Sequence, residues 1–321
     1  MSFIRSWIGV YLPLAFLPVV LFLTGCGDQG GRSTVTPVYL GSDEDEGGET
    51  EVKREKLPTN GYAKDWEGTI VFEGALPKIS PLNIKDKSGV CDSPMAIKNG
   101  DTVEHTWIID SDSKGVKNVV VFLEPPLKKY YFEIRKEDTQ PNADPAKDMV
   151  DLDQPYCAYR PHVQGYFSTY YDEDGYKWSP KHLMIKNSSA TGHNIKFSGV
   201  NLRARPKVKP PSNLNLVSGS EKEVKIWPQD TPLSVSCDIH PWMSGLVWSF
   251  DHPYFAITDE KGKFKIPYIP AGQEVRVVVW HESLPGRGFL ENGEFKGRDG
   301  KLITFNKDEV PKKLNLSISN K

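Results

Sequence analysis

The sequence of 321 residues predicts an all-β fold, arranged as β-sandwiches rather than as one barrel. β-branched and aromatic residues recur in short runs, and clusters of Pro, Gly and Asn separate these runs. No long helical periodicity competes with this pattern. The clearest expected strands cover residues 68–72, 119–123, 183–185, 224–227, 233–235 and 275–280.

The N-terminus carries the features of an export signal. Arg5 precedes an apolar run at residues 8–23, which two prolines interrupt and which is too short to predict a transmembrane span. The run ends in Leu-Thr-Gly-Cys, which resembles the bacterial lipobox, so we expect a signal peptide over residues 1–25 and a lipidated Cys26. The alternative is an ordinary signal peptide followed by a stray cysteine. Gly27, in place of an acidic residue, favours outer-membrane delivery under proteobacterium-like sorting.

Residues 26–63 predict a disordered tether between the lipid and the folded part. They are rich in Gly, Ser, Thr and charge, with an acidic run at 43–46, and they cannot bury enough apolar surface to fold. The formal net charge of the whole chain is −2, which gives no basic field for nucleic acid. We therefore expect no nucleic-acid partner.

A short loop in the C-terminal third carries three metal-binding side chains. Cys237, His240 and Met243 follow the spacing Cys-x2-His-x2-Met, and a second imidazole is available from His193, in a turn after the apolar run at 183–186. Alone, each residue has an ordinary explanation, since a buried Cys is often a small hydrophobe. A thiolate, two imidazoles and a weak thioether together form the trigonal site that holds copper in both oxidation states.

This set resembles the type 1 copper ligands of the cupredoxins, the family of plastocyanin, pseudoazurin and amicyanin, and the short loop is most similar to that of amicyanin. The resemblance implies a cupredoxin Greek-key β-sandwich at residues 148–251 and one type 1 copper. Cys237 would be the thiolate, His193 and His240 the imidazoles, and Met243 the weak axial ligand.

Two further residues take roles from the same resemblance. Asn194 would join the two ligand loops by hydrogen bonds, or it is an ordinary turn residue. In the cupredoxin pattern the edge of the downstream histidine, here His240, reaches the surface in an apolar patch. Trp242 would widen this patch for a redox partner, or it packs inward.

Residues 252–321 predict a second, smaller sandwich. The hairpin Thr-Asp-x-x-Gly-x-Phe beginning at Thr258 and a Pro-x-Gly turn at 270–272 are similar to the transthyretin-like carboxypeptidase regulatory module. Residues 64–147 form an N-terminal β region whose expected strands resemble the first half of the same sandwich. The copper domain would then be inserted between two halves of this module. The simpler alternative is three sequential pieces.

The remaining cysteines, Cys91 and Cys157, form an even pair, which predicts a disulfide in an oxidising compartment. The alternative is a second metal site from Cys157, His162 and either His105 or His182. Neither the spacing nor carboxylate partners support that site.

These features predict a membrane-anchored type 1 copper protein that carries single electrons between extracytoplasmic partners, such as a cytochrome or a copper oxidoreductase. The lipid would anchor it on the periplasmic side of a bacterial membrane. The sequence has no Gly-rich nucleotide loop, no Ser/His/Asp arrangement and no second His cluster for a substrate copper, so we expect no enzymatic activity. Two alternatives are a copper storage or delivery protein and a structural surface lipoprotein with a redox-inactive cupredoxin fold.

Overall fold

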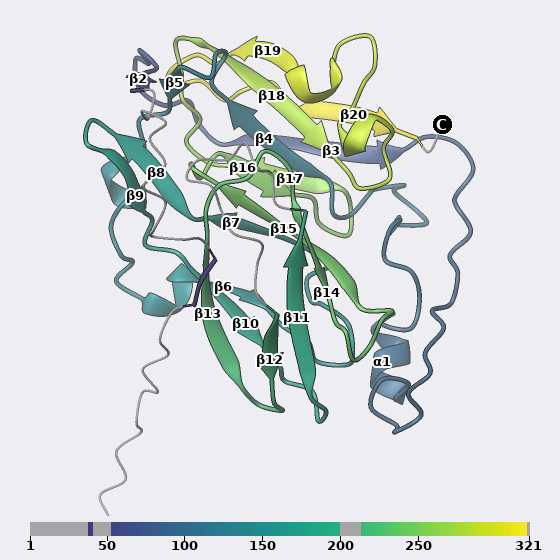
Figure 1. Ribbon diagram of the computed structural model, residues 1–321. Coiled ribbons are helices and arrows are strands. Elements are labelled where there is room, and N and C mark those ends of the chain that lie inside the picture. Colours follow the sequence, from purple (N-terminus) through teal and green to yellow (C-terminus); the bar gives the residue numbers. More distant parts are fainter. Residues whose placement is uncertain (1–37, 41–52, 200–212, 320–321) are drawn as a thin grey trace, which may run out of the picture. The chain divides into compact units, whose positions relative to one another are not determined.

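Nearly all regular structure in this protein is β (Figure 1). The computed structural model describes residues 38–40, 53–199 and 213–319. The strands of these residues are β1 (Val38–Leu40), β2 (Glu55–Lys56), β3 (Trp66–Phe72), β4 (Val120–Glu124), β5 (Tyr130–Tyr131), β6 (Met149–Leu152), β7 (Val163–Phe167), β8 (Thr169–Asp172), β9 (Gly175–Trp178), β10 (His182–Lys186), β11 (His193–Ser198), β12 (Leu214–Leu216), β13 (Glu221–Ile226), β14 (Leu233–Ser236), β15 (Ser244–Phe250), β16 (Phe255–Ile257), β17 (Lys263–Ile266), β18 (Glu274–Trp280), β19 (Lys301–Thr304) and β20 (Leu314–Ile318). The described helices are α1 (Pro94–Lys98) and the short 3-10 turns η1 (Lys136–Asp138), η2 (Pro145–Asp148), η3 (Gly286–Gly288) and η4 (Gly297–Asp299).

A first sandwich contains the ligand loop. One of its sheets has the strand order β1-β13-β10-β6, and the other has the order β12-β11-β14-β15-β7. Side chains from both sheets share one apolar core, which includes Leu183 of β10, Val224 of β13, Phe197 of β11 and Val247 of β15. The core also includes Cys237 and Met243, so the ligand loop lies at the edge of this core.

A second sandwich is assembled from both sides of the first one in the sequence. Its sheets have the orders β16-β4-β18-β19 and β17-β3-β20. β3 and β4 lie in the sequence between β1 and the other strands of the first sandwich, whereas the strands with which they pair follow β15, its last strand. The second sandwich is therefore interrupted in the sequence by most strands of the first one. The resemblance to a transthyretin-like module stays a prediction.

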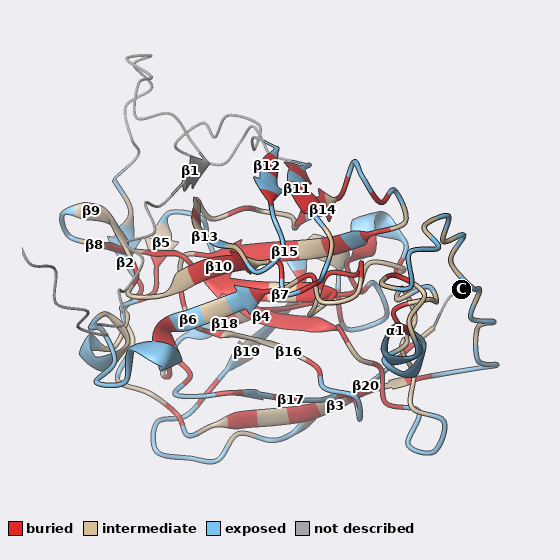
Figure 2. Ribbon diagram, turned by 90° about the horizontal axis from the view of Figure 1, so that it is seen from below, coloured by how far each residue is buried: buried red, intermediate tan, exposed pale blue. Residues whose placement is uncertain are grey.

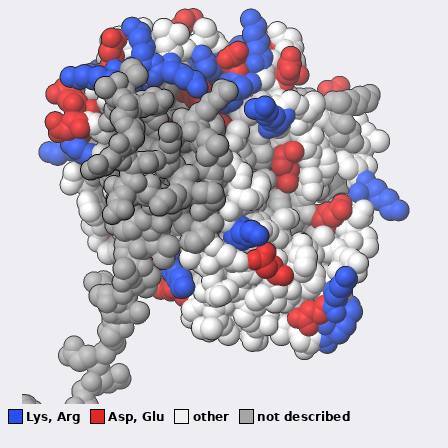
Figure 3. Space-filling view, viewed as in Figure 1, with Lys and Arg blue, Asp and Glu red and all other residues white. Residues whose placement is uncertain are grey.

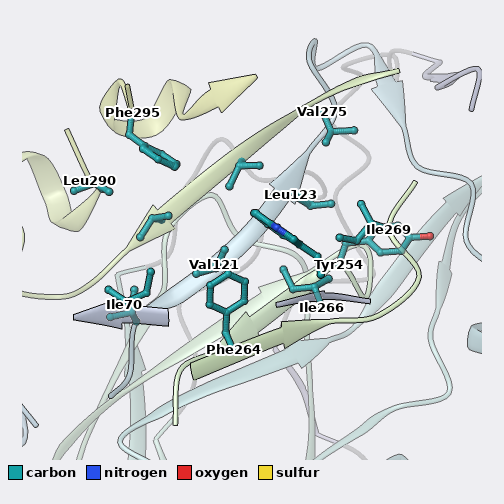
Figure 4. Packing of buried hydrophobic residues seen from close by; sticks show 14 of the residues in the cluster. Ile70, Val121, Leu123, Tyr254, Phe264, Ile266, Ile269, Val275, Leu290 and Phe295 are labelled. Atoms are coloured by element: carbon teal, nitrogen blue, oxygen red, sulfur yellow. The ribbon is translucent and has the colours of Figure 1, made fainter. Parts of the chain in front are cut away.

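The core of the second sandwich shows why these strands are so apolar. In Figure 4, Ile70 of β3, Val121 and Leu123 of β4, and Phe264 and Ile266 of β17 lie in one cluster. All of these side chains are buried. Burial of such apolar surface stabilises the fold by roughly 25 cal/mol per Å².

The two sandwiches share a third apolar core. Phe122 of β4 and Trp280 of β18 point to the face opposite the second core and join Trp248 and Phe250 of β15 in one cluster. The rings of Phe122 and Trp248 are 5.2 Å apart. Since successive strand residues face opposite sides, β4, β15 and β18 are buried on both faces, as the red strands in Figure 2 illustrate. Continuous apolar runs are typical of such strands.

The prediction of a disordered tether over residues 26–63 is wrong at residues 38–40, which form β1 beside β13, and at its C-terminal end. Residues 53–63 are folded: β2 pairs with β5, and Leu57 and Ala63 are buried. Arg54 forms an ion pair of 2.8 Å with Asp251, and its guanidinium also donates to the carbonyl of Tyr130. A single arginine with specific partners therefore helps to hold this segment in place, and composition alone could not indicate this.

All six of the clearest predicted strands are confirmed, with ends that differ by at most three residues from the prediction. They are β3, β4, β10, β13, β14 and β18. β7 begins at Val163. Pro161 lies just before this strand and has no N–H for a sheet hydrogen bond, which favours a start after it. Residues 128–137 contain β5 and η1.

On the face in Figure 3, Lys and Arg side chains lie among Asp and Glu side chains. Among the described residues, no helix is long and apolar enough to cross a membrane. The predicted signal peptide, Cys26 and the acidic run lie outside the described residues.

Candidate metal centre

Strand register brings the two ligand segments together. β11 and β14 are antiparallel, and Lys196 pairs with Ser236. The first residues of β11 therefore face the residues that follow Ser236. His193 and Asn194 begin β11, and Cys237 directly follows β14. The upstream histidine and the ligand loop consequently meet at one end of the sheet.

Three of the four predicted ligands form a compact, buried group. The Nδ1 atoms of His193 and His240 are 2.9 Å apart, and the Sγ of Cys237 is 3.9 Å from the Nδ1 of His240. Ligand atoms of the three residues all lie within 4.8 Å of one another, as a metal site requires. Their exposed fractions are 1%, 4% and 2% for His193, His240 and Cys237. Such burial excludes water from the ligand atoms.

The outer nitrogen of His193 is held by a serine. Ser189 Oγ donates its one hydrogen to the carbonyl of Thr191 at 2.9 Å and accepts from the N–H of Thr191 at 3.0 Å. Its further contact with His193 Nε2, at 3.0 Å, is then one in which Oγ accepts. We therefore assign the ring hydrogen of His193 to Nε2, which leaves its Nδ1 as a bare lone pair.

The outer nitrogen of His240 faces a carboxylate. Asp86 Oδ2 lies 3.5 Å from His240 Nε2. A carboxylate only accepts hydrogen bonds, so the ring hydrogen of His240 is assigned to Nε2. Two bare Nδ1 lone pairs then face each other at 2.9 Å beside a thiol sulfur. With this assignment, His193, His240 and Cys237 could hold a cation, and its charge would offset the repulsion between the two lone pairs.

Both imidazoles are neutral near neutral pH. Burial, and to a lesser degree the neighbouring His240, lowers the pKa of His193 to about 4. Burial also lowers the pKa of His240, while Asp86 opposes that effect. Metal ligation requires deprotonated nitrogen, so this environment favours binding of a metal.

The donor chemistry fits copper. One soft thiolate and two imidazoles are ligands that hold copper in a trigonal site. Met243 is 2% exposed, and its backbone N–H donates to the carbonyl of His240 at 2.9 Å, which closes the ligand loop tightly. The role of Met243 as axial ligand stays a prediction.

Asn194 links the two ligand segments. Its Oδ1 accepts from the backbone N–H groups of Asp238 and Ile239 at 2.8 and 3.3 Å, and lies 3.2 Å from the Sγ of Cys237. Its Nδ2 donates to Asn213 at 2.6 Å. Side chains of this kind orient ligands and tune a metal site. The position of Asn194 matches the linking role implied by the cupredoxin resemblance.

The expectation of an exposed His240 edge is wrong for this chain. His240 is 4% exposed because the segment containing Asp86 covers its outer nitrogen. Trp242 is half-buried and packs beside the imidazole, with ring centroids 5.1 Å apart. The sequence could not reveal the cover, because Asp86 lies far from the ligand loop along the chain.

The predicted disulfide is present between Cys91 and Cys157. Both sulfurs also lie within 4.8 Å of a ring nitrogen of His240. Since the sulfurs are bonded to each other, they provide no thiolate for a second metal site. The disulfide instead forms part of the wall around the metal centre, a position that the sequence did not indicate.

The alternative second metal site is not assembled by its proposed residues. His182 pairs with Glu223 at 2.9 Å, and Cys157 is in the disulfide. His105 and His162 do lie together, with ring centroids 5.5 Å apart, and His162 contacts Glu282 at 2.7 Å. Within the described part of the chain, neither group of three potential ligands within 4.8 Å includes these two histidines.

Two residues of the centre were missed by sequence analysis. Ser189 lies in the turn before His193, where a serine is also an ordinary turn residue. Asp86 belongs to a segment in which Leu82, Ile84 and Asp86 are half-buried while the intervening residues are exposed. This alternation places Asp86 on the inner side of its segment, but it does not indicate a contact with His240.

Known proteins give limited further information. No family model matches the chain, and no match was found among curated proteins. A purple cupredoxin from Nitrosopumilus maritimus is 20% identical, with 32% of this chain and 99% of that chain covered and a TM-score of 0.23. A reduced amicyanin variant is 16% identical, with 37% and 97% covered and a TM-score of 0.24.

A copper-containing nitrite reductase from Thermus scotoductus SA-01 is 14% identical, with 32% of this chain and 22% of that chain covered and a TM-score of 0.24. Two structural neighbours are thus cupredoxins and one is a copper enzyme. At these TM-scores the similarities carry no argument about function.

Proposed function

We propose that this chain is a type 1 copper protein that carries single electrons. The observation that carries the proposal is the buried pair of Nδ1 atoms of His193 and His240, 2.9 Å apart, beside the Sγ of Cys237. His193, His240 and Cys237 would hold the copper, with Met243 as the weak axial ligand. Bound copper would supply a centre that alternates between Cu(II) and Cu(I).

The surroundings of the ligands favour electron transfer over copper delivery. Asn194 fixes the ligand loop through two backbone N–H groups, and Ser189 and Asp86 fix the two rings. A ligand set held in this way moves little when the charge of the metal changes. The covered His240 also opposes rapid release of copper, which a delivery protein needs.

We further propose an extracytoplasmic location and redox partners for this chain. The lipobox-like sequence ending at Cys26 supports an extracytoplasmic protein anchored by lipid to a bacterial membrane. The partners would be redox proteins, such as a cytochrome or a copper oxidoreductase, and the chain itself would not be an enzyme. A cytochrome that exchanges electrons with the copper-loaded protein would support this assignment.

Copper titration of the purified chain tests the central proposal. We expect one copper per chain, an intense visible thiolate-to-copper charge-transfer band and a narrow copper hyperfine splitting. His193→Gln should abolish the band, whereas the matched change His182→Gln, remote from the ligand group, should retain it. A colourless protein with an ordinary tetragonal copper signal would contradict the proposal.

A further inference from the structure

We propose that Asp86 is a positioning residue of the metal centre. Its carboxylate holds the Nε2–H of His240, so that the Nδ1 lone pair stays turned toward Cys237 and His193. The effect on copper rests on the proposed function, whereas the orientation of the ring does not. Outer-shell carboxylates on ligating histidines have this role in many metal proteins.

The carboxylate of Asp86 is itself fixed in orientation. The backbone N–H of Ser88 donates to Oδ1 at 2.8 Å. The other oxygen, Oδ2, lies 3.5 Å from His240 Nε2 and 3.4 Å from the Sγ of Cys91. One oxygen is thus occupied by the local turn, and the other is directed at the imidazole.

The segment around Asp86 is fastened to the first sandwich on both sides. Ile84 and Val90 pack against the apolar core that contains Cys237 and Met243. One residue further on, Cys91 joins the segment covalently to Cys157. The carboxylate is therefore held over His240 by apolar contacts and a disulfide, which is the rigidity that a positioning group needs.

The negative charge of Asp86 would also affect the reduction potential of a bound copper. The carboxylate of Asp86 is partly exposed and accepts a hydrogen bond from the N–H of Ser88, and a carboxylate of this kind carries a negative charge at neutral pH. A negative charge beside a ligating imidazole stabilises Cu(II) more than Cu(I). Asp86 should therefore lower the reduction potential of the centre as well as orient its ligand.

The first test needs no metal. In the metal-free full-length chain labelled with 15N-histidine, the ring nitrogen shifts of His240 report which nitrogen carries the hydrogen, and His240→Gln assigns the signal. Wild type should show hydrogen on Nε2. Asp86→Ala should give a mixture of both tautomers, whereas Asp86→Asn, which keeps an accepting oxygen, should retain the Nε2–H form.

The second test uses the copper-loaded chain. For Asp86→Ala we expect Cu(II) affinity to fall about tenfold or more, with a smaller loss for Cu(I). If the affinity for Cu(II) falls ten times more than the affinity for Cu(I), the reduction potential of this one-electron couple rises by about 59 mV. Asp86→Asn should raise the reduction potential through the loss of charge alone. Asp86→Glu should retain part of the Cu(II) affinity and part of the low reduction potential that Asp86→Ala loses.

Asp92→Asn is the matched control. It removes one carboxylate from the same segment, where Asp92 pairs with Lys87 at 3.6 Å. The proposal is overturned if Asp86→Ala leaves the tautomer of His240 unchanged. It is also overturned if the copper centre has the same reduction potential in the Asp86→Ala chain as in the Asp92→Asn chain. A wild-type chain that binds no copper would overturn the proposed function, while the tautomer experiment would still decide the role of Asp86.

Discussion

Replacement of Cys91 and Cys157 together by Ala should destabilise the protein strongly without removing its copper. The disulfide joins residues 66 positions apart. For a loop of this length the chain-entropy model gives a stabilisation of about 4 kcal/mol. Both cysteines are buried in the first core, so the loss of two sulfur atoms adds a smaller packing term.

Urea unfolding of the metal-free wild type and double variant measures the difference directly. We expect the free energy of unfolding to fall by about 4 kcal/mol, and the thermal midpoint to fall by roughly 8 °C or more. The copper stoichiometry and the visible band should persist, because none of the four predicted ligands is changed. Loss of copper to a chelator should be faster, since the segment over His240 is no longer held covalently.

The matched control for the cavity term is Cys237→Ala, which removes a buried sulfur but opens no cross-link. It should cost about 1 kcal/mol in the metal-free chain. A double variant no less stable than this control would refute the reasoning. A count of three free thiols in the denatured, metal-free Cys26→Ala chain would also refute it, since only Cys237 should react.

Three further predictions address the ligands, the anchor and the buried histidines. Cys237→Ser should abolish the visible band, whereas Met243→Leu should retain copper and raise the potential; equal loss of copper in both would contradict the ligand roles. Mass spectrometry should find a lipidated Cys26, and an unmodified thiol in the mature chain would contradict the lipobox. Burial lowers the pKa of His252 and of His281 to about 4 from the ordinary 6.5, so the unfolded chain binds more protons in this window. Acidification from pH 6.5 to 4 should therefore cost the metal-free chain about 3 kcal/mol per histidine, and a flat urea-unfolding profile would contradict this.

The sequence predicted strands best where both faces are buried. Residues 119–123 and 275–280 are continuous apolar runs, and β4 and β18 alternate between the second core and the shared core. The hairpin β8–β9 was not predicted, although an Asp-Gly pair, a recognised hairpin signal, lies where its turn meets β9, at Asp174 and Gly175. Hydrophobicity alone did not predict this hairpin, because its Tyr-rich, charged strands contain no long apolar run.

The ligand set was predictable because its chemistry is local. Cys237, His240 and Met243 lie on one loop, and their spacing alone indicates a metal. His193 required only the assumption of a neighbouring strand. Asp86 could not be found in this way, because its contact with His240 depends on an irregular segment whose path is set by the disulfide and by packing. Irregular segments have no period from which their contacts can be derived.

The interrupted topology gives the second sandwich a role at the metal centre. The ligand loop connects β14 to β15, so its geometry depends on how firmly β15 is held. Along β15, Val247 packs into the core beneath Cys237 and Met243, whereas Trp248 and Phe250 pack against β4 and β18 of the second sandwich. The register of β15 with β7, from Leu246 opposite Val163 onward, fixes the strand along its length. A shift of one residue would turn both aromatic rings toward the wrong core. The second sandwich therefore holds the strand that positions the ligand loop, which gives a physical reason for the two folds to share one chain.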